Sequence, residues 1–318
     1  MDLKHLTAMV TVADVGSVTR AAELLHVVQP AVTRQIRALE QELGVELFER
    51  TRHGMRLTKA GEVMVDRARR ALLELERARA EIRPTPGQVI GVVQVGLLES
   101  TAELIAEPLV SALAQAHPGI QLHVITGYSG HLQRWLDDGD LDLSLLYNLA
   151  STPALHVQPL ADERLWAVAP ADAGLVPERP VSVAEAASHP MVMPAAGHGL
   201  SAVLDTAFDS AGVTAEVSVR TNSMQLQKLF VQAGLGLTIL PGVGIAIDHR
   251  SGRISAAPLC EPEVRRSIVI GMRRTGRPSA ATDVVAAELT NQVRMAVQNG
   301  TWPASALASA VSTDPQIP

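Results

Sequence analysis

The sequence predicts an α/β protein in two unlike parts: residues 1–83 read as almost all helix, and short strands alternate with helices from Val89 onward. Apolar residues recur at helical spacing through the first part. The sequence Pro84-Thr85-Pro86-Gly87 then breaks the pattern and marks a linker. The alternation that follows is typical of an α/β sheet. A length of 318 residues is enough for two or three domains.

The first part is expected to hold helices over about 3–13, 18–25, 30–43 and 59–83. Ser17 stands where the N-cap of the second helix belongs, Pro30 suits the first turn of the third, and Gly44 ends that helix. Residues 45–57 are short, polar and contain a glycine, which predicts a hairpin or wing. The last helix begins after Thr58.

The second and third helices and the turn His26-Val27-Val28 have the spacing of a helix-turn-helix unit, whose second helix enters the major groove of DNA. Arg34 can pair with a guanine edge and Gln29 with an adenine edge, while Thr33 and Arg37 can meet phosphate or a thymine methyl. By spacing alone, an ordinary polar helix face is the alternative. The exposed residues expected in the first turns are Gln29, Pro30, Thr33, Arg34 and Arg37.

The long fourth helix carries apolar and small residues at alternating spacings of three and four, the heptad pattern that favours helix pairing. We expect this seam to join two copies of the chain, and packing on its own domain is the alternative. The seam consists of Gly61, Met64, Ala68, Ala71, Leu75, Ala78 and Ile82.

Charge is unevenly distributed along the chain, whose net charge is −6. Residues 1–83 hold 14 Lys and Arg against 12 Asp and Glu, a net of +2, and the remainder nets −8. Four cations and no acid lie between Arg50 and Lys59. Phosphate contact depends on such a local patch rather than on whole-chain charge, although a solvated basic loop would look the same.

The composition of the chain and its first residues indicate where in the cell the protein is expected. The chain is 47% hydrophobic and lacks any apolar run of about 18 residues, so no membrane-spanning helix is expected. The start, Met1-Asp2-Leu3-Lys4-His5, lacks the regions of a secretory signal. The single cysteine, Cys260, excludes an intrachain disulfide and a cysteine-rich zinc site. We therefore expect a cytoplasmic protein without a metal or other cofactor.

The second part reads as an α/β sheet followed by an Ala-, Ser- and Pro-rich tail over 301–318 that is expected to be disordered. Expected strands are 89–97, 120–125, 141–147, 165–169, 191–193, 215–220, 237–240 and 267–272, with helices such as 102–116, 131–138, 200–211 and 224–233 between them.

The stretches 24–40 (LLHVVQPAVTRQIRALE), 43–50 (LGVELFER) and 57–61 (LTKAG) resemble the signature of the LysR-type transcriptional regulators. The resemblance covers about residues 1–300, and residues 129–147 and 197–200 look similar to the nitrogen-assimilation-control subgroup. It implies a sequence-specific DNA-binding transcription regulator, commonly a tetramer, that responds to a small-molecule effector. The implied parts are a winged helix-turn-helix (1–58), a dimerising linker helix (59–83), a hinge (84–87) and an effector domain (88–300).

Residue roles follow from the same resemblance. Gln29, Pro30, Thr33 and Arg34 would face the groove, Arg50 and Thr51 would hold the DNA backbone, and Arg52 on the wing would approach the minor groove. One departure is Val28, which stands where the family commonly has Ser or Thr and which cannot cap the helix.

The effector domain of the family resembles periplasmic binding proteins, with a ligand cleft between two α/β subdomains, here expected at 88–162 plus 266–300 and at 163–265. Ligands of such folds lie beyond strand ends near helix N-termini, where hydroxyls and free N–H groups suit a small anion. Simple helix capping is the alternative at each position. The candidates at such ends are Ser100, Thr101, Thr126, Ser129, His198 and Thr221.

Two rival classes of protein are weighed against a regulator. An enzyme is not expected, because the sequence has no Walker loop, GxSxG elbow or His-Glu zinc pattern. A solute-binding protein for transport would need an export signal and would not need the basic residues near Arg52.

Overall fold

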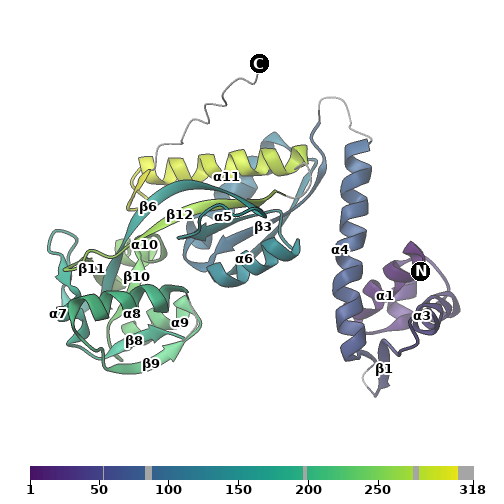
Figure 1. Ribbon diagram of the computed structural model, residues 1–318, viewed down its shortest axis with the longest axis horizontal. Coiled ribbons are helices and arrows are strands. Elements are labelled where there is room, and N and C mark those ends of the chain that lie inside the picture. Colours follow the sequence, from purple (N-terminus) through teal and green to yellow (C-terminus); the bar gives the residue numbers. More distant parts are fainter. Residues whose placement is uncertain (53, 83–87, 196–198, 275–278, 307–318) are drawn as a thin grey trace. The chain divides into compact units, whose positions relative to one another are not determined.

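The computed structural model describes residues 1–52, 54–82, 88–195, 199–274 and 279–306. The chain divides into two compact units, Met1–Pro84 and Thr85–Pro318 (Figure 1). No helix in the described residues is long and apolar enough to cross a membrane. The expected linker at 84–87 lies outside the described residues.

The first unit has the predicted order of helices and a hairpin. Ser17 caps the second helix by accepting from the Arg20 N–H, and Gly16 and Gly44 end helices in the left-handed conformation. Apolar faces of the helices and of the hairpin meet in one core. The elements are α1 (Leu3–Val15), α2 (Val18–Leu24), α3 (Gln29–Leu43), β1 (Phe48–Thr51), β2 (Gly54–Leu57) and α4 (Lys59–Ile82).

Two glycines let the hairpin approach the helices closely. The Met55 N–H donates to the Gly16 carbonyl at 2.8 Å. A Cβ on Gly54 would lie 2.4 Å from that carbonyl oxygen, and a Cβ on Gly61 would lie 2.0 Å from the Leu47 carbonyl oxygen. The hairpin is therefore fixed against α1 and α4 within this unit.

The seam predicted on α4 divides into two stretches. Gly61 and Ala68 are buried and Met64 is partly buried, and all three lie toward the core of the first unit. Leu75 and Ile82 are 40% and 77% exposed. The expectation that the whole seam is free for a partner helix is therefore wrong for its first half, because the short helices and the hairpin cover that half.

The second unit alternates strands and helices. Its strands are β3 (Gly91–Leu98), β4 (Ile120–Gly127), β5 (Leu143–Tyr147), β6 (Leu155–Pro170), β7 (Val181–Ser182), β8 (Met191–Pro194), β9 (Val217–Thr221), β10 (Thr238–Pro241), β11 (Ile254–Cys260), β12 (Arg265–Arg273) and β13 (Ala304–Ala306). Its helices are α5 (Glu99–Ala116), α6 (Ser129–Asp138), the short η1 (Ala171–Ala173), α7 (Val183–Ala187), α8 (Gly199–Ala211), α9 (Met224–Gln232), α10 (Gly242–Arg250) and α11 (Ala280–Gln298).

Two long strands join two lobes of this unit. The main sheet has the order β4-β3-β5-β12-β6-β11-β7, and β10 and β13 also pair with β6. Residues 155–164 of β6 pair with β12, whereas residues 165–170 pair with β10 and β11. The core of the first lobe draws mainly on residues 93–161 and 268–302, and the cores of the second lobe draw on residues 165–264. The strands β6 and β12 therefore connect separate cores.

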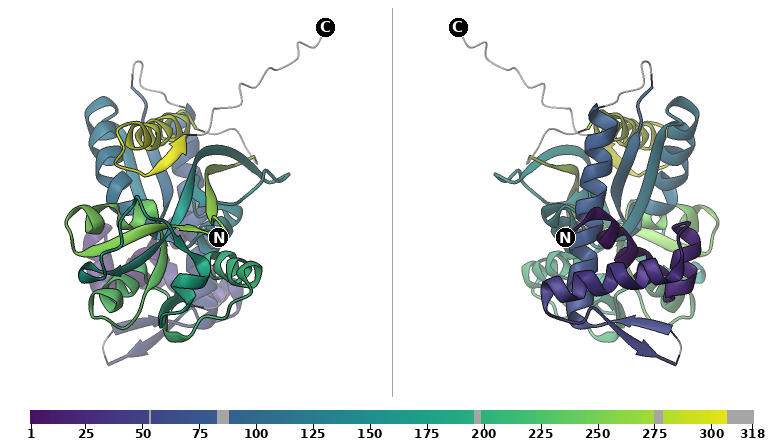
Figure 2. Two further views of the ribbon diagram at one scale, coloured as in Figure 1. Left: turned by 90° about the vertical axis from the view of Figure 1, so that its left-hand side faces the viewer. Right: turned by 90° about the vertical axis from the view of Figure 1, so that its right-hand side faces the viewer.

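The expectation of a disordered tail is wrong for residues 301–306. The Trp302 side chain is fully buried in the core of the first lobe. After it, β13 pairs with β6 so that Ala304 lies opposite Glu163, close to α11 (Figure 2). One large aromatic side chain anchors a segment whose composition otherwise lacks any pattern. Residues 307–318 lie outside the described residues.

Candidate functional site

The third helix of the first unit presents a polar face opposite a buried one. Val32, Ile36 and Leu39 point into the core, whereas Arg34 and Arg37 are exposed. Pro30 occupies the first turn, where a missing N–H is harmless. The apolar Val28 stands at the N-cap, as the sequence indicated. The face is therefore free for an outside partner along its first turns.

Side-chain contacts order the start of this face. The Gln29 amide donates to the Thr33 hydroxyl at 3.1 Å, and that hydroxyl donates to the Gln29 carbonyl at 3.3 Å. Gln29 is exposed and Thr33 is partly buried. The amide oxygen of Gln29 and its second N–H are left for a base edge.

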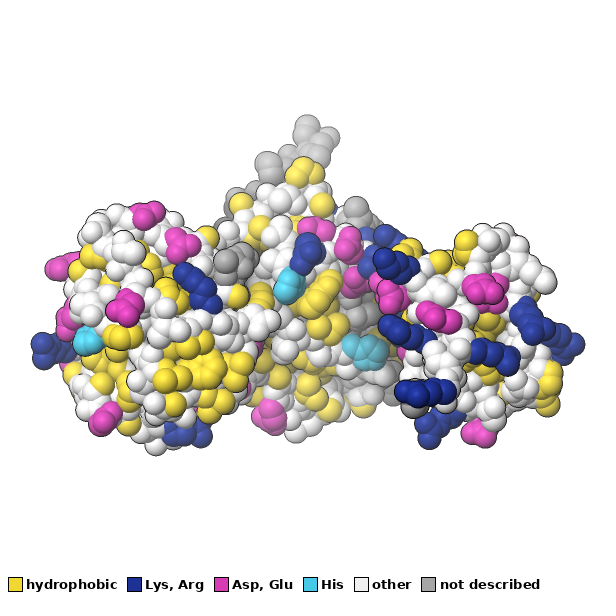
Figure 3. All heavy atoms as spheres, turned by 90° about the horizontal axis from the view of Figure 1, so that it is seen from below, with side chains coloured by type: hydrophobic (Ala, Val, Ile, Leu, Met, Phe, Trp, Pro, Cys, Tyr) yellow, Lys and Arg dark blue, Asp and Glu magenta, His cyan; other side chains and the backbone are white. Residues whose placement is uncertain are grey.

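The hairpin adds a second basic surface. Arg50, Thr51 and Arg52 are exposed at the end of β1. Thr51 donates its hydroxyl to the Gly54 carbonyl at 3.2 Å, across the turn of the hairpin. Arg37 and Arg50 line a hollow between α3 and the hairpin. Lys and Arg side chains are frequent on the face of this unit that Figure 3 shows on its right-hand side.

The second unit contains a pocket at the carboxyl ends of strands, where several helices begin. Its empty volume is about 440 Å³, including its open mouth. Most of the wall is apolar or aromatic, with hydroxyls and two charged groups set into it. The lining residues are Leu98, Glu99, Ser100, Gly127, Tyr128, Ser129, Tyr147, Pro194, Leu200, Thr221, Ser223, Met224, Gln227, Leu240, Pro241 and Arg266.

Three of the six predicted effector residues come together in this pocket: Ser100, Ser129 and Thr221. Thr101 is instead fully buried, and its hydroxyl donates to the Leu98 carbonyl at 3.0 Å, so it is not directed into the pocket wall. Thr126 is exposed on β4, since side chains alternate along a strand. His198 lies outside the described residues.

A buried ion pair lies behind one wall of the pocket. Arg266 is 4% exposed and Glu163 is fully buried, and the Arg266 Nε donates to Glu163 Oε1 at 2.7 Å. The Arg266 Nη2 donates to the Ser100 hydroxyl at 2.7 Å. Glu163 Oε2 accepts from the Trp302 indole N–H at 2.9 Å and from the Val243 N–H at 3.3 Å. This cluster was not predicted, because its members are far apart in the sequence.

Two tyrosines complete the wall. The Arg266 guanidinium lies 5.1 Å from the centre of the Tyr147 ring. Burial raises the pKa of Tyr147, and the charge of Arg266 and the Leu200 N–H offset that effect only in part. Burial and the nearby charge of Glu99 raise the pKa of Tyr128 to about 12. Both phenols are therefore protonated near neutral pH.

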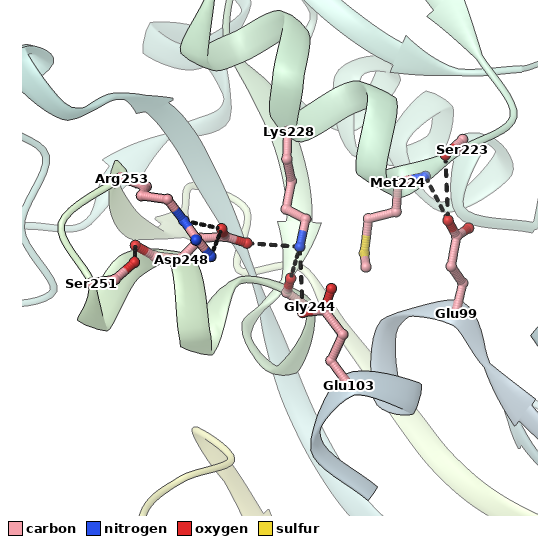
Figure 4. Close-up of polar contacts among 9 residues, drawn as sticks. All are labelled: Glu99, Glu103, Ser223, Met224, Lys228, Gly244, Asp248, Ser251 and Arg253. Carbon is pink, nitrogen blue, oxygen red and sulfur yellow. Dashed lines mark hydrogen bonds and ion pairs between the residues drawn. The ribbon is translucent and has the colours of Figure 1, made fainter. Parts of the chain in front are cut away.

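Polar contacts link α5 of the first lobe to α9 of the second (Figure 4). Glu99 Oε1 accepts from the Met224 N–H at 3.2 Å and from the Ser223 hydroxyl at 3.5 Å. One turn further along both helices, Glu103 lies 3.6 Å from the Lys228 ammonium. These contacts hold the two lobes together beside the pocket.

The Lys228 ammonium is itself buried in an ionic cluster. It pairs with Asp248 at 2.7 Å and donates to the Gly244 carbonyl at 3.3 Å, and Arg253 pairs with the same Asp248 (Figure 4). Burial raises the pKa of Asp248, but the hydrogen bond and charge of Lys228, with Arg253, outweigh burial and hold the pKa below its ordinary value. Among the residues described, no group of three metal-ligating side chains is found.

Two family models match the chain. Residues 3–62 match the helix-turn-helix of bacterial regulatory proteins of the lysR family, and residues 86–294 match the LysR substrate binding domain. The second match alone covers more than half of the chain.

Curated relatives match over nearly their whole length. The HTH-type transcriptional regulator BbuR of Bordetella bronchiseptica is 27% identical over 95% of this chain and 93% of its own. The dual regulator OxyR of Escherichia coli is 29% identical over 87% of this chain and 91% of its own. The nitrogen assimilation regulatory protein Nac of Klebsiella aerogenes is 27% identical over 90% of this chain and 93% of its own.

Solved structures share the fold. Full-length OxyR from Pseudomonas aeruginosa aligns with a TM-score of 0.67 at 24% identity, over 93% of this chain and 95% of that one. Full-length CbnR, solved in complex with its target DNA, aligns with a TM-score of 0.69 at 23% identity, over 93% and 99%. The chain thus belongs to the LysR family of bacterial helix-turn-helix regulatory proteins, and it is a DNA-binding transcription regulator with an effector-binding domain.

Proposed function

We propose that this regulator reads specific DNA sites with α3 and changes its activity when a small molecule with an anionic group occupies the pocket of the second unit. One observation carries the first half of the proposal: Arg34 and Arg37 stand exposed on a helix whose opposite face is buried. The order of the chain is winged helix-turn-helix (1–58), linker helix (59–83), hinge (84–87) and effector domain (88–300), with subdomains at 88–162 plus 266–300 and at 163–265.

On DNA, Gln29, Pro30, Thr33 and Arg34 meet base edges, because they occupy the first turns of the helix that enters the major groove. Outside the groove, Arg37, Arg50 and Thr51 contact the phosphate backbone, and Arg52 approaches the minor groove. The exposure of these side chains supports the assignment. The polar contact between Gln29 and Thr33 sets the amide for a base edge.

In the pocket, Ser100, Ser129 and Thr221 supply hydroxyls, and Arg266 supplies a positive charge. Carboxylates and other anions are favoured at helix N-termini, where N–H groups point outward. The proposal depends less on Thr101, Thr126 and His198: the hydroxyl of the first is bonded to the Leu98 carbonyl, the second is exposed on β4, and the third lies outside the described residues.

Two chains pair through the second half of the α4 seam, where Leu75 and Ile82 are exposed. Small residues at neighbouring heptad positions let helices approach closely. Two such dimers form a tetramer on promoter DNA. The protein acts in the cytoplasm, where its DNA target is, and turns over no substrate; the relatives named above are all regulators.

A gel-shift titration against the promoter beside its own gene tests the DNA-binding roles. Arg34→Ala should reduce discrimination between that site and random DNA by about 1–3 kcal/mol, since a bidentate base contact is lost. Arg50→Ala should weaken both DNAs similarly and reduce the salt dependence of binding. Arg294→Ala, an exposed arginine of the second unit, serves as the matched control. Equal losses on both DNAs for both variants would contradict the roles assigned.

A screen of small carboxylates tests the pocket separately. A ligand that raises the melting temperature of the full chain should lose its effect in Ser129→Ala, because the hydroxyl lies in the pocket wall. A carboxylate that stabilises both forms equally binds elsewhere, and such a result would remove this part of the proposal.

A further inference from the structure

Two charged side chains line the pocket, Arg266 and Glu99, and only the charge of Arg266 is compensated by a partner of opposite charge within the described residues. The charge of Arg266 is compensated by the buried Glu163 at 2.7 Å. In the part of the chain that the structure describes, the cations nearest the pocket, Arg266 and Lys228, have other carboxylate partners, and Glu99 takes part in no ion pair. Among the described residues, the pocket wall together with the buried Glu163 behind it therefore carries an uncompensated negative charge at Glu99.

The hydrogen bonds of Glu99 leave its charge unneutralised. Its Oε1 atom accepts from two neutral donors, the Met224 N–H at 3.2 Å and the Ser223 hydroxyl at 3.5 Å (Figure 4). Both bonds are long for a charged acceptor, where lengths of about 2.7–2.9 Å are usual for strong pairs. The N-terminus of α9 offers a partial positive charge but no ammonium or guanidinium.

The charge of Glu99 reaches the aromatic wall beside it. Together with burial, it raises the pKa of Tyr128 to about 12. A tyrosine ring next to a carboxylate is a suitable surface for a small cation, because the ring face attracts positive charge. Glu99 and Tyr128 thus form a corner of the pocket that favours a cationic group.

The opposite chemistry is present at Arg266. Its Nε and one Nη2 hydrogen are used by Glu163 and Ser100, and the guanidinium has further N–H donors. The hydroxyl of Ser129 and the N-terminus of α6 lie in the same wall. A carboxylate is the group that these donors suit. The lining also contains apolar residues, with Leu98, Leu200 and Leu240 among its members.

We propose that the effector is a small zwitterion with an apolar body, whose carboxylate faces Arg266 and Ser129 and whose ammonium group pairs with Glu99. This inference rests on the proposed role of the pocket as the effector site. A ligand with only an anionic group would place a second negative charge near Glu99, whereas an ammonium group compensates the charge already there.

The test compares ligands that share one carbon frame. Isothermal titration of the full chain uses L-leucine, its deaminated form isocaproate and its decarboxylated form isoamylamine. The corresponding sets are L-valine with isovalerate and isobutylamine, and L-phenylalanine with hydrocinnamate and phenethylamine. At least one amino acid should bind the full chain more tightly than its own carboxylate and amine, by about tenfold or more, since a hydrogen-bonded charge pair in a pocket contributes this much.

Two variants with the same change in charge test whether the preference for the amino acid over its carboxylate depends on Glu99. Glu99→Gln keeps an acceptor for the Met224 N–H, and it should remove most of the preference for the amino acid over the carboxylate. Glu107→Gln lies two turns further along α5 at an exposed position and should leave the preference unchanged.

Three results would overturn the zwitterion: no amino acid of the panel binds, carboxylates bind as tightly as amino acids, or Glu99→Gln leaves the preference intact. If carboxylates bind as tightly as amino acids and Ser129→Ala abolishes that binding, the anion pocket stands while the zwitterion fails. If binding is indifferent to Ser129→Ala, the pocket itself is refuted.

Discussion

Replacing Arg266 by Met tests whether the buried pair stabilises the second unit. The variant leaves Glu163, which is fully buried, with only two of its three donors, the Trp302 indole N–H at 2.9 Å and the Val243 N–H at 3.3 Å. Breaking a buried pair by removing one partner costs about 3–5 kcal/mol, because the remaining charge is uncompensated. Methionine keeps much of the packing against Tyr147, so the loss is mainly electrostatic.

Urea unfolding of the full chain measures this loss. The chain has three tryptophans, at positions 135, 166 and 302, so indole fluorescence follows the second unit alone. The variant with both Arg266→Met and Glu163→Gln should lie within about 2 kcal/mol of the unaltered chain, since a neutral pair needs no counter-charge. Arg164→Met, whose side chain is 46% exposed and pairs with Glu263, is the control and should cost less than about 1 kcal/mol. The reasoning fails if Arg266→Met costs no more than this control, or if the second change brings no recovery.

Two further predictions concern the ionic cluster and the linker helix. Asp248→Asn should destabilise the second unit near neutral pH, and its difference from the unaltered chain should shrink in acid. The reason is that the pKa of Asp248 is held below its ordinary value, so the stabilisation is complete above the ordinary pKa of an aspartate and is lost as pH falls through the lowered pKa. Urea midpoints at several pH values check this, and a difference that grows in acid would contradict it. Leu75→Glu should lower the dimer fraction in sedimentation experiments, because it places a charge in the exposed part of the α4 seam. Val63→Glu changes a 65% exposed residue outside the seam and should leave the association unchanged; equal effects would argue against pairing through the seam.

Local signals allowed the first unit to be predicted almost completely. Ser17, Pro30 and Gly44 mark helix ends by chemistry that acts over three or four residues, and the structure has those ends. The same holds for Ser100 and Ser129, which stand two residues after the ends of β3 and β4 and lie in the pocket. Predictions of this kind succeed because the cause and its effect are neighbours in the sequence.

The rest of the pocket depends on strand register, which the sequence leaves open. Glu163 and Arg266 are 103 residues apart and meet because they are paired positions of β6 and β12. The first part of β6 contains Pro159 and several charged residues, so its apolar pattern is weak and the strand was expected only from about residue 165. Trp302 stands in a segment without periodicity, and its indole N–H donates to the carboxylate of Glu163.

The buried pair also decides which variants can identify an effector contact. Arg266 lines the pocket, but it also compensates Glu163, which in turn holds Trp302 and the N–H of Val243. A variant of Arg266 that lost its response to a ligand would therefore report on the junction of β6, β12 and β13 as much as on the ligand. Glu99→Gln keeps an acceptor for the Met224 N–H and removes the charge. Because of this difference, a change in ligand preference at Glu99 can be assigned to the ligand, whereas the same change at Arg266 cannot.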